Sequence, residues 1–164
     1  MPNEYTIHRL VCATRPGWEK ERDLFLTTLS AFAERVTMPD WVLLAPASFS
    51  DGFDAKLQQA VVKNNIQNSV FFLGVFDQDP ADPVYKRFAE YAIECAGDPE
   101  LPMRRVTLLF KDAGDAAEEM LALGEKMSRL CEVRNFGKIK DLPAIFEEIL
   151  SGWYALVRPG ADPP

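Results

Sequence analysis

Four polar residues that could bind a ligand stand directly behind two strand-like segments of the sequence. Thr14 and Arg15 follow the segment 7–13, and Asp77 and Asp79 follow the apolar run 70–76. The two carboxylates could bind a hard cation or the hydroxyl groups of a sugar, and Arg15 could hold a phosphate group. The alternative is structural, because acidic residues are common in turns that precede helices and Arg15 would then be an ordinary surface arginine.

Glu90 is the fifth candidate, and it lies in the helical pattern that follows the run 70–76. A carboxylate brought to a cleft by such a helix could stabilise positive charge on a ligand. The competing interpretation is a solvated helix face, since Lys86, Glu90 and Glu94 are spaced four apart and Lys86 could pair with Glu90.

Several common chemistries lack their motifs. The segment 13–18 holds a single glycine, so neither a dinucleotide-binding fingerprint nor a P-loop follows the first strand. There is no G-x-S-x-G elbow, and the only histidine, His8, stands at the start of a strand, which favours a satisfied structural or surface histidine. Without paired Cys or His spacing we expect no metal site, and we expect no bound cofactor.

The elements that must position these residues alternate regularly. Strands are predicted at 7–13, 41–45, 70–76, 106–110 and 131–136, and helices at 18–37, 54–65, 82–97, 116–130 and 141–157. This order predicts an α/β fold, a three-layer doubly wound five-stranded parallel sheet, because right-handed crossover helices join parallel strands.

A flavodoxin-like strand order, 2-1-3-4-5, is favoured because it places the longest apolar strand, 70–76, in the centre; a Rossmann-like order is the alternative. The alternating pattern of 131–136 indicates an edge strand. Ligands of such sheets bind at the carboxyl ends where the strand order reverses, here between the first and third strands. The predicted cleft is bounded by Thr14, Arg15, Asp77 and Glu90.

Composition limits the class of protein. The 164 residues are 48% apolar and 26% charged, which fits one domain over 1–157 with a disordered Pro/Gly tail at 158–164. A net charge of −7 opposes binding to nucleic acid or to an anionic membrane surface. The start of the chain shows no secretory pattern, so a cytoplasmic location is expected, and the three separated cysteines are expected to be buried and reduced.

Three short motifs carry a resemblance to a known family. Glu21-Arg22-Asp23 opens the first helix after a polar turn, and Asn68-Ser69 leads into the strand 70–76. The segment 85–92 resembles a family segment in which a glutamate, here Glu90, lies on the helix after the central strand and is followed by a small residue. The strand 106–110 is followed directly by Lys111-Asp112. These features resemble the TIR-like domains of bacterial conflict and signalling proteins, in a branch of uncharacterised function, over about residues 7 to 157.

The resemblance implies a function. Active TIR domains cleave the nicotinamide–ribose bond of NAD, and the family glutamate, Glu90 here, would stabilise the oxocarbenium-like transition state. One departure is that Arg87-Phe88-Ala89 replaces the aromatic-cysteine pair that often precedes that glutamate. The alternative function is therefore a non-catalytic module that senses a nucleotide or associates with its own kind.

Overall fold

The computed structural model of the protein describes residues 6–14, 19–40, 42–46, 55–76, 83–111 and 131–158. Strands and helices alternate along these ranges as the apolar periodicities predict. In chain order the elements are β1 (Thr6–Thr14), α1 (Glu19–Asp40), β2 (Val42–Pro46), α2 (Ala55–Gln67), β3 (Phe71–Phe76), α3 (Pro83–Ala96), β4 (Arg105–Lys111), β5 (Cys131–Phe136), the short 3-10 turn η1 (Ile139–Asp141) and α5 (Leu142–Val157). The predicted helix 116–130 and the tail 159–164 lie outside the described residues.

The five strands form one parallel sheet in the order β2-β1-β3-β4-β5. The flavodoxin-like order is therefore confirmed and the Rossmann-like order is wrong. The central strand is β3, whose residues 71–75 are all buried, because helices cover the sheet on both faces and only apolar side chains fit there. The edge position predicted for 131–136 is confirmed, since β5 pairs with β4 alone among the described strands.

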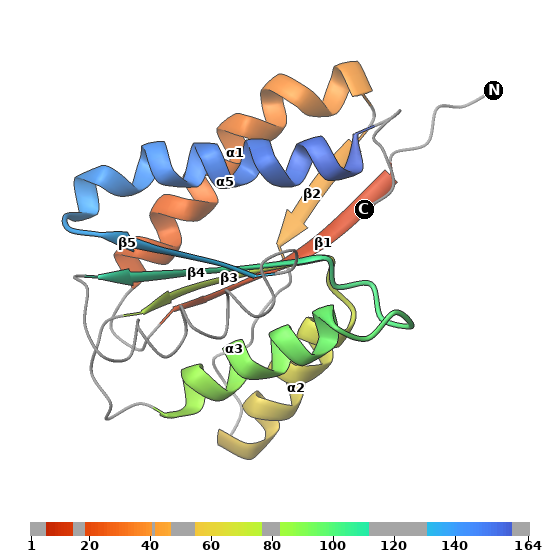
Figure 1. Ribbon diagram of the computed structural model, residues 1–164. Helices are drawn as coiled ribbons and strands as arrows, with labels where there is room; N and C mark the ends of the chain where they lie inside the picture. Colours follow the sequence, from red (N-terminus) through yellow and green to blue (C-terminus); the bar gives the residue numbers. More distant parts are fainter. Residues whose placement is uncertain are drawn as a thin grey trace.

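Helices α1 and α5 cover one face of the sheet, and α2 and α3 cover the other (Figure 1). The pleat of β1 explains how one strand serves both layers, because successive side chains point to opposite faces. Leu10 and Cys12 join the core beneath α1 and α5, whereas Val11 and Ala13 join the core beneath α2 and α3. The result is two apolar cores separated by the sheet.

Most boundaries differ from those predicted by one to three residues, and three differences have a physical reason. α1 was expected to break at Met38, but it continues to Asp40; Pro39 costs only one hydrogen bond so close to a helix end. Pro46 was expected to end β2, yet it is the last paired residue and aligns with Leu10, because an edge strand tolerates a residue without an N–H group.

The third difference concerns the inward face of α2. The apolar spacing of this helix predicts Leu57, Val61 and Val62 on the inward face. Val62 is buried, Val61 is only half-buried, and the side chain of Leu57 lies outside the described ones. Ile66 is buried as well. α2 extends to Gln67 rather than ending at 65. Ile66 therefore falls one turn beyond Val62 on the same face, and this pair takes the inward position. The described residues include no helix that is long and apolar enough to span a membrane.

Candidate functional site

The candidate site lies at the carboxyl ends of β1 and β3, the two neighbours at which the strand order reverses. From β1 the chain passes to α1 on one face of the sheet, and from β3 it passes to α3 on the other face (Figure 1). Because the two connections leave toward opposite faces, a crevice forms outside the carboxyl ends of these strands, and folds of this kind commonly bind ligands there.

Thr14 is the last residue of β1 and is aligned with Val75 of β3. Its side chain is half-buried. By the alternation of the strand it lies on the same face of the sheet as Cys12, beneath α1 and α5. The hydroxyl group of Thr14 is therefore placed at the predicted edge and can donate or accept a hydrogen bond there.

Glu90 lies on the outer, exposed face of α3. Phe88, Ala89 and Ala92 form the opposite, buried face of the helix. Glu90 is seven positions beyond Pro83, the first residue of α3, which corresponds to about 10 Å along the helix axis. Within the described part of the chain, its carboxylate forms no hydrogen bond or ion pair. The predicted pairing with Lys86 falls on a side chain outside the described ones.

Thr14 and Glu90 do not converge. Thr14 belongs to the face beneath α1 and α5, and Glu90 points outward from the helix layer on the other face. The other three predicted residues, Arg15, Asp77 and Asp79, lie outside the described residues. Of the predicted cleft, the structure thus describes one side chain at the edge of the sheet and one on a solvated helix surface.

The three cysteines are free and buried, which confirms their prediction as small core residues. Burial raises the pKa of the Cys12 thiol to about 12 and that of the Cys131 thiol to about 11. Burial also raises the pKa of Cys95, which lies one helical turn from Tyr91. Since the thiolate is the nucleophilic form, none of these residues is suited to nucleophilic catalysis at neutral pH.

His8 was predicted to be a satisfied structural histidine or a surface histidine, and it is half-buried. Its Nε2 atom is buried and has no hydrogen-bond partner among the described residues. Burial, and then the positive charge of Arg104, lower the pKa of His8 below 6.5. His8 therefore stays neutral at neutral pH. It lies near the amino end of β1, whereas Thr14 lies at the carboxyl end of the same strand.

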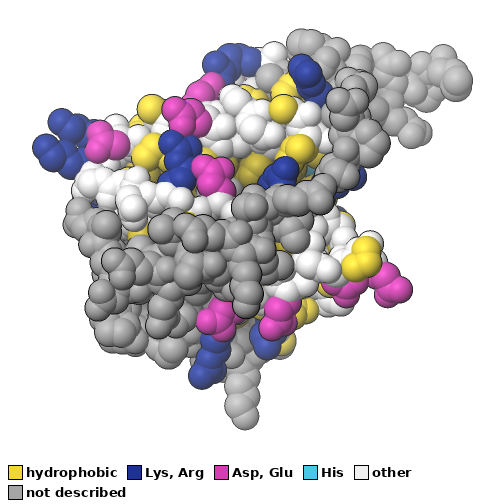
Figure 2. Space-filling model, in the orientation of Figure 1, with side chains coloured by type: hydrophobic (Ala, Val, Ile, Leu, Met, Phe, Trp, Pro, Cys, Tyr) yellow, Lys and Arg dark blue, Asp and Glu magenta, His cyan; other side chains and the backbone are white. Residues whose placement is uncertain are grey.

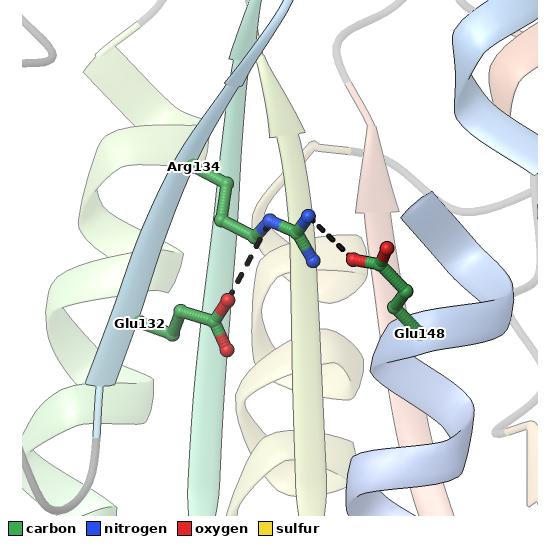
Figure 3. Close-up of polar contacts among 3 residues, drawn as sticks. All are labelled: Glu132, Arg134 and Glu148. Atoms are coloured by element: carbon green, nitrogen blue, oxygen red, sulfur yellow. Dashed lines mark hydrogen bonds and ion pairs between the residues drawn. The ribbon is translucent and has the colours of Figure 1, made fainter. Parts of the chain in front are cut away.

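Ion pairs on the outer surface of α5 are structural. Arg134 of β5 lies between two carboxylates, with its guanidinium 2.6 Å from Glu148 of α5 and 3.6 Å from Glu132 (Figure 3). On the other side of α5, Glu147 pairs with Arg35 of α1. These contacts join α5 to its two neighbours, and positive and negative side chains are correspondingly interspersed on this side of the molecule (Figure 2).

The adjacent arginines Arg104 and Arg105 form a basic cluster of only two residues in the sequence, which is too short to predict a nucleic-acid site. The structure adds two arginines from distant segments to the same edge of the sheet, Arg9 of β1 and Arg158 beyond α5. No group of three or more His, Cys, Asp or Glu residues within the described ranges could hold a metal ion. No protein-family model matches the chain, and no curated protein sequence matches it.

Proposed function

We propose that the protein is a TIR-like domain that binds NAD or a related nucleotide at the carboxyl edge of β1 and β3. The observation that carries the proposal is the reversal of strand order between these two neighbours, because open parallel sheets bind ligands at that point. The resemblance to TIR-like domains supplies the class of ligand. Thr14, Arg15, Asp77 and Asp79 are the residues proposed to contact it.

The role that we propose for the bound nucleotide is regulatory, with the domain acting as a non-catalytic nucleotide sensor or interaction module. The exposed position of Glu90 favours this role. A carboxylate that stabilises an oxocarbenium-like transition state must lie beside the anomeric carbon, in a site that excludes water. A side chain on the outer face of α3 meets neither condition.

A binding experiment tests the proposal. NAD is titrated by calorimetry into the wild type, into Thr14→Val and into a matched control, Thr27→Val, whose threonine is exposed on α1. Loss of one hydrogen bond should weaken binding by about threefold to tenfold for Thr14→Val only. Absence of NAD binding at millimolar concentration, or an equal loss in both variants, would contradict the proposed site.

The second candidate function is cleavage of the nicotinamide–ribose bond with Glu90 as the catalytic residue, motivated by the resemblance. Nicotinamide release from NAD is followed for the wild type, Glu90→Gln and Glu94→Gln, whose side chain is also exposed one turn further along α3. A loss of about a hundredfold in Glu90→Gln alone would establish this function. Absent release supports the non-catalytic role, and equal release in all three proteins would exclude Glu90 as the catalytic residue.

A further inference from the structure

Four arginines lie together at the amino edge of the sheet. The Val70 N–H donates to the carbonyl of Arg9 at 2.8 Å, and the Val70 carbonyl accepts from the Arg104 N–H at 2.7 Å. Arg9 and Arg104 therefore flank the same residue, and Arg105 follows as the first residue of β4. The three arginines come from segments that are about 95 residues apart in the chain, and only β3 separates these segments in the sheet.

The fourth arginine, Arg158, reaches this edge from α5. The Arg104 guanidinium donates to the carbonyl of Leu156 at 3.5 Å, and the Arg158 N–H donates to the carbonyl of Tyr154 at 2.9 Å. The end of α5 therefore lies beside the start of β4. We refer to Arg9, Arg104, Arg105 and Arg158 as the amino-edge arginine cluster.

No carboxylate among the described residues neutralises the cluster. None of its four members forms an ion pair there, whereas Arg22, Arg35 and Arg134 each contact an acidic side chain. The turn before β4 contains two acidic residues, Asp98 and Glu100. The Asp98 carboxylate accepts the Glu100 N–H at 2.9 Å, and neither carboxylate forms an ion pair with a described residue. In a chain of net charge −7, this is a local concentration of uncompensated positive charge.

Helix stabilisation explains only part of the cluster. Cations near helix carboxyl ends are favourable, and the contact of Arg104 with Leu156 is of this type. That contact uses one of the five donors of the guanidinium. Arg9, Arg104 and Arg158 are exposed and Arg105 is half-buried, so their other donors face solvent. Strong, planar donor sets of this kind recognise carboxylates and phosphates.

We propose that the amino-edge arginine cluster docks an acidic segment of a partner protein. Arg105 lies on the same face of the sheet as Leu109, beneath α5, and the Arg104 guanidinium contacts α5 on that side. Arg9 lies two strands away, roughly 10 Å across the sheet, and extends the positive charge toward the other face. An open surface of this width suits carboxylates spaced along an extended peptide better than a small molecule, which requires a concave pocket. A nucleic acid would extend beyond the cluster and meet the acidic remainder of a chain of net charge −7, whereas a short acidic segment contacts only the cluster.

The test measures binding of a fluorescein-labelled decapeptide of alternating Glu and Gly at low ionic strength, by fluorescence anisotropy. Arg104→Gln/Arg105→Gln is compared with Lys20→Gln/Lys140→Gln, which removes two exposed positive charges elsewhere. We expect Kd to rise by about tenfold in the arginine variant only. Binding that is absent, or weakened equally in both variants, would overturn the proposal.

His8 supplies a second readout, because it is the only histidine in the chain and Arg104 contributes to lowering its pKa. A peptide carboxylate that neutralises Arg104 should raise the pKa of His8, measured from its ring signals by NMR. An unchanged pKa at saturating peptide would place the peptide elsewhere and contradict the proposal. If a single-stranded oligonucleotide binds the same arginines more tightly than the peptide, the partner is a nucleic acid and the proposal is overturned.

Discussion

Trp153 of α5 stacks on Phe71, the first residue of β3, with ring centroids 4.7 Å apart and planes inclined by 5°. The ring of Phe25 of α1 packs edge-to-face against Trp153, with ring centroids 6.4 Å apart, and against Phe146, with ring centroids 5.2 Å apart. The same aromatic cluster therefore joins α1, α5 and the central strand. Its position predicts that the α1 and α5 layer depends on Trp153.

Trp153→Ala should lower the free energy of unfolding by about 3–5 kcal/mol, because it removes a buried aromatic side chain and leaves a cavity. Urea denaturation measures this loss. Ser151→Ala, on the exposed side of α5, should stay within about 0.5 kcal/mol of wild type. If Trp153→Ala does not fold, Trp153→Phe should show a smaller loss in the same direction. Equal stabilities of Trp153→Phe, Ser151→Ala and wild type would contradict the assignment.

Tyr154→Phe should raise the free energy of unfolding by about 1 kcal/mol. The Tyr154 hydroxyl is buried without a hydrogen-bond partner among the described residues, and such a group retains its desolvation cost. The ring itself packs edge-on against Phe32 of α1 at 5.8 Å, and phenylalanine preserves that contact. The same urea experiment measures the change. A loss of more than about 1 kcal/mol would mean that the hydroxyl is hydrogen-bonded in solution.

The stability of the protein should fall as the pH drops below 6.5, through His8. The folded-state pKa of His8 lies below its ordinary value of 6.5, because of burial and then of Arg104. The unfolded chain therefore binds the proton first, and stability that is fully present above pH 6.5 is lost as the pH falls toward the folded pKa.

Urea midpoints for wild type and His8→Gln, measured between pH 7.5 and 5.5, test this effect. The wild type should lose stability across this range, and the loss should be smaller in His8→Gln because the variant has no histidine. Parallel pH profiles for the two proteins would show that other groups are responsible.

The three cysteines should resist modification in the folded protein. Cys12, with a pKa of about 12, and Cys131, with a pKa of about 11, are almost entirely protonated at pH 8, and all three side chains are buried. An aromatic disulfide reagent should titrate no thiol in buffer and three in guanidinium chloride. Rapid reaction of one thiol in buffer would place that cysteine outside the core.

Much of the fold could be predicted from the sequence because its determinants are local. Residues 70–76 include no ionisable or hydrogen-bonding side chain, so they could only be a strand covered on both faces, and the structure places β3 at the centre. The regular spacing of Phe146, Leu150 and Trp153 likewise specified the buried face of α5. Helix ends were less predictable, since Pro39 is tolerated in the last turn of α1.

The candidate site was less predictable because a ligand site depends on distances between segments. The spacing of Lys86, Glu90 and Glu94 is compatible both with a catalytic helix and with a solvated one, and only burial distinguishes them. Arg9 and Arg104 illustrate the converse. Nothing in their local sequence connects them, and their proximity results from the hydrogen bonds that both make with Val70.

The strand order also has a consequence for how the chain reaches its folded state. The central strand is the third to be synthesised, and its register aligns Leu10 with Phe71. Until β3 has left the ribosome, β1 can pair only with β2, and the backbone groups on its inner side stay unpaired. Each strand pair also closes a long loop, so contact order is high and folding is expected to be slow. The unpaired backbone edge of β1 and its exposed apolar side chains form the surface that a chaperone would have to protect during this interval.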